Sequence, residues 1–196
     1  MVKLNKVKIV VFYNKKDINI FEFNNNIYNL FHEKLVNMQP TVLGPQEVPN
    51  VPLSIWNSKN LIISYTNSNF EIQLLEENLS NLEWFFEKVD DIIQFLKTEL
   101  VRVGIVYEAS VDLDFHEKFK EFYKYKILDS KEFNISWLDN FDGLWDYNFW
   151  QHYQTYGNNK QYIIDINTKI GQKNFDLDKV LKEIDSKYGD EISKWN

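Results

Sequence analysis

The chain has 196 residues, of which 44% are hydrophobic, and its formal net charge is -7 at pH 7. This length allows one sizeable core, whereas the negative charge argues against a general nucleic-acid binder, which needs a basic face. The lack of cysteine excludes disulfides, thiol catalysis and cysteine-ligated zinc.

The composition also indicates an AT-rich coding sequence. Lys, Asn, Ile, Phe and Tyr are abundant, whereas Arg102 is the only arginine and Ala109 is the only alanine. Such a composition is typical of an AT-rich bacterium, its phage or another mobile element. No stretch approaches the roughly 18 apolar residues that a membrane span requires, and lysines interrupt the N-terminal apolar run, unlike in a signal peptide. We therefore expect a soluble, cytoplasmic protein.

The N-terminal part of the chain alternates between strand and helix patterns. Alternating apolar residues over 7–13 predict a first strand. The run Asn24-Asn25-Asn26 offers helix caps ahead of apolar residues spaced three to four positions apart, so we expect an amphipathic helix over 26–38. All four prolines then fall within 40–52, which favours a packed, extended connection over the alternative of a flexible domain linker.

A hairpin, a helix and a long strand are predicted next. Two apolar runs flank 67–69, where asparagine tolerates the positive φ of a tight turn. Ser80 and Glu83 form a capping-box pattern at the start of a helix that runs to about Glu99. Over 101–113 the odd positions are apolar without a break and most even positions are polar, which is the pattern of an antiparallel, half-buried strand. An amphipathic helix with Phe115, Phe119 and Phe122 on its inner face should follow.

The segment 139–156 reads DNFDGLWDYNFWQHYQTY and raises the question of an active site. Under strand geometry its residues divide between two faces. One face carries Trp145, Tyr147, Phe149 and Tyr153, and the other carries Asp146, Asn148, Trp150, His152, Gln154 and Tyr156. We therefore interpret it as a strand with one unusually aromatic face, followed by a turn and a partner strand over 160–168. A last amphipathic helix is expected over 176–195.

Written out, this order is β-α-β-β-α twice. We expect an α+β fold in which one or two antiparallel sheets carry helices on one face. The expected organisation is a single domain, 1–196, with a pseudo-repeat whose halves are 1–99 and 100–196.

Several segments share a recognisable order and pattern. They are LEWFFEKVDDIIQFL, RVGIVYEASVD, YIIDIN and DLDKVLKEIDSKYGDEI. Together they resemble a sporadically distributed family of uncharacterised bacterial and phage proteins, over about residues 60–113 and 160–195. Residues 102–105 fit the usual central strand of that family, but Val106 stands where a second arginine is usual. The resemblance implies a fold and carries no activity, cofactor or site residue.

Two kinds of chemistry can be weighed against the acidic and histidine residues. A metal site would draw on Asp139, Asp142, Asp146 and His152. In a strand, however, Asp146 and His152 would lie about 20 Å apart. We therefore expect no metal and no cofactor. Any of His32, His116 and His152 could act as a general base beside a carboxylate, but GxSxG, P-loop and GxGxxG patterns are missing.

The remaining candidate is a binding surface on the aromatic strand. Large aromatics mixed with hydrogen-bonding groups are typical of interface hot spots. The candidate binding residues are Trp150, Tyr156, His152 and Trp145. The alternative is that Trp150 is simply buried.

We accordingly expect a non-enzymatic interaction protein that binds a protein partner or self-associates, for example as a homodimer. It would suit a phage or mobile-element accessory protein that binds and modulates a host defence protein. The alternative is a small-molecule or nucleotide-handling enzyme with a pocket between the two halves. Nucleic-acid mimicry is disfavoured, because acidic residues alternate with lysines and form no dense negative stripe.

Overall fold

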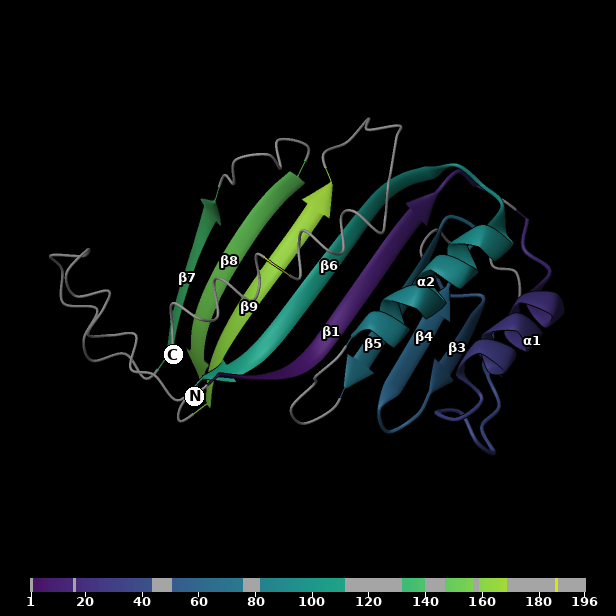
Figure 1. The fold of residues 1–196 in the computed structure, drawn as a ribbon, viewed down its shortest axis with the longest axis horizontal. Helices are drawn as coiled ribbons and strands as arrows, with labels where there is room; N and C mark the ends of the chain where they lie inside the picture. The colour runs from purple at the N-terminus through teal and green to yellow at the C-terminus, as the bar shows by residue number, and fades with distance from the viewer. Residues whose placement is uncertain are drawn as a thin grey trace, which may run out of the picture.

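The computed structural model describes residues 2–15, 17–43, 51–75, 82–111, 132–139, 147–156, 159–168 and Ser186. Within these residues the chain forms one sheet of nine strands and two helices (Figure 1). The strands are β1 (Val2–Tyr13), β2 (Thr41–Val42), β3 (Ser54–Asn57), β4 (Leu61–Tyr65), β5 (Asn69–Leu75), β6 (Leu100–Val111), β7 (Glu132–Asp139), β8 (Tyr147–Tyr156) and β9 (Asn159–Thr168). The helices are α1 (Ile20–Phe31) and α2 (Glu83–Leu96).

The strand order is β2-β3-β4-β5-β1-β6-β9-β8-β7, and all neighbouring strands are antiparallel. The two longest strands, β1 and β6, pair at the centre. A three-stranded meander flanks each of them, β3-β4-β5 beside β1 and β7-β8-β9 beside β6. The order is therefore symmetric about the central pair, apart from the short extra strand β2.

The prediction of a mixed fold built on an antiparallel sheet is confirmed. The predicted β-α-β-β-α halves are not, because each flank holds three strands where the sequence indicated two. Strand β3 follows directly on the segment expected as an extended connection, of which 44–50 lies outside the described residues. The expected helix around Phe115–Phe122 also lies outside them, as does the expected helix over 176–195 except for Ser186. Confinement of the helices to one face therefore stays a prediction for the whole chain.

Helix α1 begins earlier than its apolar pattern indicated. The side-chain oxygen of Asn19 accepts hydrogen bonds from the backbone N–H groups of Phe21 (3.1 Å) and Glu22 (3.2 Å), so Asn19 is the N-cap. The predicted start at Asn24-Asn25-Asn26 and the predicted span 26–38 are therefore wrong. The helix ends at Phe31, and the chain continues in turns through Asn37, whose φ is 59°.

Asn24 is buried within α1 and links the helix to the sheet instead of capping it. Its Oδ1 accepts hydrogen bonds from Ser54 Oγ (3.1 Å), Trp56 Nε1 (3.0 Å) and Tyr65 OH (3.2 Å). These three donors come from β3 and β4, and all three residues are buried. One amide oxygen therefore satisfies polar groups from two strands, which fixes the position of α1 over them.

Helix α2 also differs from the prediction at its start. Leu82 is the N-cap and makes no side-chain capping bond, and Glu83 is the first helical residue. The predicted capping box is wrong, because it requires Glu83 at the third helical position. The helix ends with Lys97 in the left-handed conformation (φ 49°), where its N–H donates to Ile93 O at 3.3 Å.

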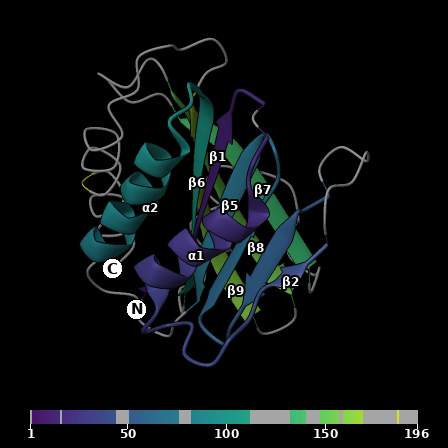
Figure 2. The same cartoon turned by 90° about the vertical axis from the view of Figure 1, so that its right-hand side faces the viewer.

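The core lies between the two described helices and one face of the sheet. Phe23 of α1 packs on Tyr65, with ring centroids 4.2 Å apart, and lies 5.9 Å from Phe95 of α2. Both helices lie on the same side of the sheet (Figures 1 and 2). Odd-numbered residues of β1 and β6 are buried on this side, as alternation predicted, namely Val7, Ile9, Val11, Tyr13, Val103, Ile105, Tyr107 and Ala109. Between the register shifts at the two ends of this pair, the even-numbered residues from Lys6 to Phe12 and from Arg102 to Glu108 point to the other side, called the second face below.

Candidate functional site

The second face can be traced from strand to strand through the register. Residues paired directly across an antiparallel sheet point to the same side. Starting at Lys8 in β1, the pairing leads to Val106 in β6, Asp165 in β9, Trp150 in β8 and Leu138 in β7. This row therefore contains the charged residues Lys8 and Asp165 and the large apolar residues Trp150 and Leu138, although they are far apart in the sequence.

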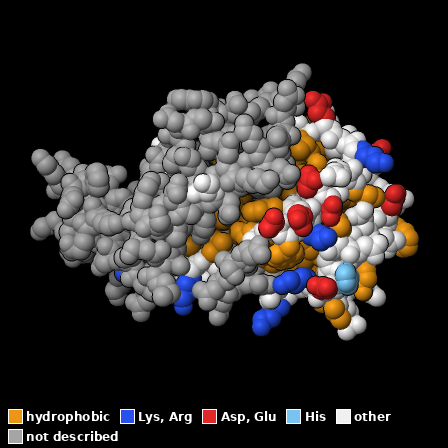
Figure 3. Space-filling view, viewed as in Figure 1, with side chains coloured by type: hydrophobic (Ala, Val, Ile, Leu, Met, Phe, Trp, Pro, Cys, Tyr) orange, Lys and Arg blue, Asp and Glu red, His pale blue; other side chains and the backbone are white. Residues whose placement is uncertain are grey.

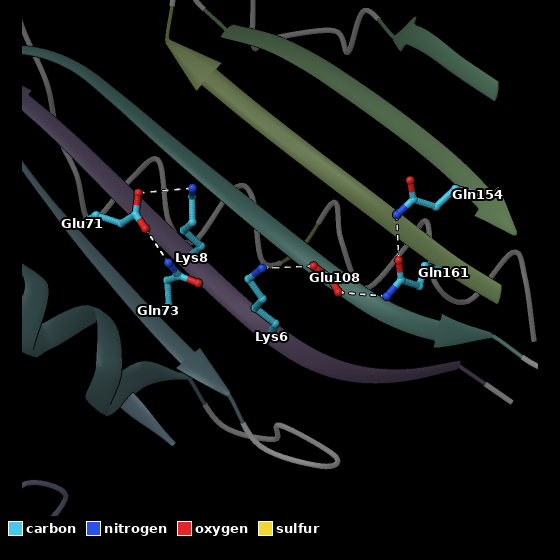
Figure 4. A network of polar contacts seen from close by, with 7 residues as sticks. All are labelled: Lys6, Lys8, Glu71, Gln73, Glu108, Gln154 and Gln161. Carbon is cyan, nitrogen blue, oxygen red and sulfur yellow. Dashed lines mark hydrogen bonds and ion pairs between the residues drawn. The ribbon is translucent and has the colours of Figure 1, made fainter. Parts of the chain in front are cut away.

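A first part of the second face is a polar network whose members satisfy one another (Figure 4). Lys6 Nζ lies 3.3 Å from Glu108 Oε2, and Glu108 Oε1 accepts from Gln161 Nε2 at 3.1 Å. Gln161 Oε1 in turn accepts from Gln154 Nε2 at 2.7 Å. On β1 and β5, Lys8, Glu71 and Gln73 form a second group, in which Lys8 Nζ lies 3.2 Å from Glu71 Oε2. Partly exposed pairs of this kind stabilise the sheet by about 0–1 kcal/mol each.

A second part of this face is aromatic and exposed. Trp150 retains 38% of its accessible surface, and Leu138, directly opposite in β7, retains 45%. The indole ring of Trp150 stacks on the imidazole of His152, with centroids 6.3 Å apart and planes inclined by 16°. Ser136 Oγ and His152 Nδ1 form a hydrogen bond of 2.7 Å. The exposed indole therefore stands beside a histidine whose orientation is fixed from the neighbouring strand.

Asp165 lies next to this aromatic part and is held by Asn167, whose Nδ2 donates to Asp165 Oδ1 at 2.5 Å. Asn167 pairs with Gly104, and a Cβ at Gly104 would lie 2.8 Å from Asn167 Oδ1. A side chain at residue 104 would therefore displace the amide of Asn167 from this position. Burial raises the pKa of the Asp165 carboxyl, and the hydrogen bond from Asn167 opposes this effect, as does the nearby His152.

Arg102, the only arginine in the chain, is a further component of the second face. It lies in β6 opposite Phe12 of β1 and contributes a positive charge close enough to act on Asp165. Its Nε atom is buried and has no hydrogen-bond partner among the described residues. A buried donor without an acceptor costs about 1–3 kcal/mol. Because Arg102 Nε is enclosed by the protein, Arg102 acts on this part of the face through its charge.

The sequence-predicted site residues have different outcomes. Trp150 and His152 lie on the second face, and the exposure of Trp150 excludes its complete burial. The backbone of Tyr156 pairs with Glu132 and Asn159, and its side chain is outside the description. Trp145 lies outside the described residues.

Residues that sequence reasoning missed are Ser136, Asp165, Asn167 and Arg102. Their only signal was a polar residue at an alternate strand position, and the strand order is needed to bring them together. The candidate metal residues Asp142 and Asp146 and the histidine His116 lie outside the described residues. Within the described part of the chain, no three His, Asp or Glu side chains gather as a metal site would require.

The helix-covered side has a different character. Figure 3 shows acidic side chains gathered over α2, where Glu83, Glu87 and Asp91 are exposed. Lys88 Nζ lies 3.7 Å from Asp91 Oδ2, a pair on the solvent side of the helix. These charges form an ordinary solvated helix face.

No protein-family model matches the chain, and a search of curated proteins finds no match to it. The resemblance to a sporadically distributed bacterial and phage family therefore stays a prediction. Neither of the two described helices combines the length and hydropathy that a membrane-spanning helix needs.

Proposed function

We propose that the protein is a non-enzymatic binding protein that recognises a partner protein through the second face of its sheet, around Trp150. The observation that carries the proposal is the exposed indole of Trp150, stacked on His152 and placed directly opposite both Asp165 and Leu138. Tryptophan and arginine are the residues most enriched at the energetic centres of protein interfaces, where a large apolar surface is buried beside hydrogen-bonding groups.

The polar groups around Trp150 support a specific complex. The positive charge of Arg102, which acts on Asp165, would favour a carbonyl or carboxylate oxygen of the partner near this site. Asp165 would accept from a donor of the partner. Because the neighbouring Lys6–Glu108–Gln161 network is internally satisfied, recognition would concentrate on the aromatic part of the face.

We further propose that the partner is a protein of the host cell, such as a component of a defence system that the binding modulates. The support is compositional: the Lys- and Asn-rich, Arg-poor sequence is typical of AT-rich phages and mobile elements. Self-association through the same face is the other arrangement in which Trp150 would be covered.

The test compares Trp150→Ala with a matched control, Phe21→Ala. Phe21 is 77% exposed and lies in α1, on the opposite side of the sheet from Trp150. Tagged wild-type protein is used to capture partners from lysate of the native host, and the affinity of the purified partner is then measured for all three proteins. We expect Trp150→Ala to weaken binding at least about 30-fold, equivalent to about 2 kcal/mol, and Phe21→Ala to leave it unchanged. Equal binding by both folded variants would rule out Trp150 as the centre of the interface.

The Ser136–His152 hydrogen bond favours a second candidate, an enzyme acting on a small ester or related substrate. In that case Ser136 Oγ would be the nucleophile, His152 the base at 2.7 Å, and the Asp165 carboxylate would stabilise the protonated imidazole. Hydrolysis of activated esters that is lost in Ser136→Ala and kept in Trp150→Ala would favour the enzyme. The reverse pattern, with Ser136→Ala inert in the ester assay and Trp150→Ala defective in binding, would favour the binding protein.

A further inference from the structure

The edge strand β7 lacks the features that normally keep sheet edges apart. It is last in the strand order, so among the described residues no strand pairs with its outer edge. Its eight residues, EFNISWLD, pair with β8 without a register shift and contain neither proline nor lysine. Edge strands with exposed N–H and C=O groups are usually blunted by short length, Pro, Lys or a bulge. The opposite edge follows this rule, because β2 has only two residues.

The order of residues in β7 is self-complementary. If two copies pair antiparallel with Ile135 opposite itself, each residue of β7 is opposite the residue of the second copy that lies equally far from Ile135 in the other direction. The position of Phe133 is then opposite that of Trp137 in the second copy, and aromatic residues at opposed positions favour strand pairing. The position of Asn134 is opposite that of Ser136, and the position of Glu132 is opposite that of Leu138. No two like charges are opposed in this register.

Leu138 links this edge to the exposed aromatic surface. It is 45% exposed, lies directly opposite the 38% exposed Trp150, and faces the same side of the sheet. Pairing of two β7 strands would therefore cover one flank of the apolar surface and join the second faces of both copies into one.

We propose that the protein forms a homodimer in which β7 of one copy pairs antiparallel with β7 of a second copy, about a two-fold axis at Ile135. A second copy is favoured over an unrelated strand because two-fold pairing joins two β7 edges, which no described strand covers, through the same residues. This inference does not rest on the proposed function, because it is argued from the backbone edge of β7 and not from recognition of a partner by Trp150.

Cysteine cross-linking tests the register directly, because the native chain contains no cysteine and an introduced one is the only thiol. Directly opposed residues have Cα atoms about 4.5–5.5 Å apart, within the range of about 4.4–6.8 Å that a disulfide spans. We expect Ile135→Cys to form a disulfide-linked dimer under mild oxidation. Ser136→Cys should cross-link poorly, because the two copies of residue 136 would be diagonal, about 7–8 Å apart. Val36→Cys, at a 60% exposed position away from β7, measures random collision.

A charge test in the same register needs no cross-link and changes only an exposed side chain. Leu138→Glu would place a carboxylate opposite Glu132 of the other copy, twice per dimer, whereas Leu138→Lys would place an ammonium group there. Sedimentation should give a dimer of two 23.6-kDa chains for the wild type and Leu138→Lys, and at least about tenfold weaker dimerisation for Leu138→Glu. A monomeric wild type at about 100 µM would overturn the proposal, as would Ile135→Cys cross-linking no faster than Val36→Cys.

Discussion

The charged form of the Asp165 side chain is destabilised by its burial in the folded protein. Burial raises its pKa, so its protonated form is favoured in the folded state more than in the unfolded chain. The corresponding stability is fully present below the ordinary pKa of 3.8 and is lost as the pH rises through the folded-state value. At neutral pH the charged Asp165 therefore destabilises the protein. Such a cost at a half-buried residue beside Trp150 is expected of a group retained for binding.

Replacing this carboxylate with an amide should separate stability from binding. Asp165→Asn keeps the acceptor for Asn167 Nδ2 and removes the charge, so we expect a higher melting temperature than wild type at pH 7. The difference should narrow as the pH is lowered toward 4, because wild-type Asp165 then becomes neutral too. Thermal unfolding followed by circular dichroism at both pH values checks this. If Asp165→Asn is less stable than wild type at pH 7, the surroundings of Asp165 offset the cost of burying its charge.

Ionisation of Tyr65 should make the stability of the protein depend on pH in the alkaline range. Burial raises its pKa to about 12 from 10.0, so the fold favours the neutral phenol. The stability that this provides is complete below pH 10 and is lost as the pH rises from 10 toward 12. We expect Tyr65→Phe to be about 1 kcal/mol less stable than wild type at pH 7, because it lacks the hydrogen bonds to Ile20 O and Asn24 Oδ1.

Between pH 10 and 12 the stability of Tyr65→Phe should fall less steeply than that of wild type, so that the two curves converge. Urea unfolding at pH 7, 10 and 11.5 measures this. Parallel curves would mean that ionisation of Tyr65 does not contribute to alkaline unfolding, and would leave the buried Tyr13, whose pKa burial also raises, as the main group.

At the scale of the elements, Asn24 is the residue that fixes α1 on the sheet. Asn24→Leu would leave the buried donors of Ser54 and Trp56 without their shared acceptor, whereas the Tyr65 hydroxyl would keep its hydrogen bond to Ile20 O. We expect a loss of about 3 kcal/mol in the free energy of unfolding, since each buried unsatisfied group costs about 1–3 kcal/mol. Asn25→Ala, at the exposed next position, should change it by less than about 0.5 kcal/mol. Urea unfolding of both variants shows whether the loss of stability comes from the buried amide of Asn24 or from a change in helix propensity.

The same helix shows what the sequence could and could not reveal about the elements. Alternation of apolar residues predicted β1, β6 and the β8–β9 hairpin, because a strand with one buried face has a strict period of two. The start of α1 was mispredicted because four asparagines, at 19 and 24–26, are equally suited to cap a helix. Tertiary contacts decide among them: Asn24 is needed in the core, which leaves Asn19 as the cap.

At the scale of the whole molecule, the candidate site depends on strand order. Ser136 and His152 are 16 residues apart, and Arg102 is more than 30 residues from either. The sequence predicted an aromatic strand around Trp150 because that information is local, but it left open whether Trp150 is exposed or buried. It could not predict Asp165 or Arg102 as neighbours, because their proximity follows from the pairing of β6 with β9 and of β9 with β8.

The symmetric strand order explains why the second face is continuous. Because β1 and β6 pair at the centre, the meanders extend the same face in both directions, and the row from Lys8 to Leu138 crosses five strands. A polar and aromatic surface that extends over five strands suits a protein partner better than a small molecule, which binds in a concave pocket.

Hydroxyl-radical footprinting of the protein with and without its captured partner tests this binding surface most directly. Trp150 and Phe21 are both exposed aromatic side chains, on opposite sides of the sheet, so each serves as the control for the other. If the second face binds the partner, oxidation of Trp150 should fall at least about fivefold in the complex, with Phe21 unchanged. Protection of Phe21 with Trp150 still fully reactive would contradict the proposal and place the interface on the helices.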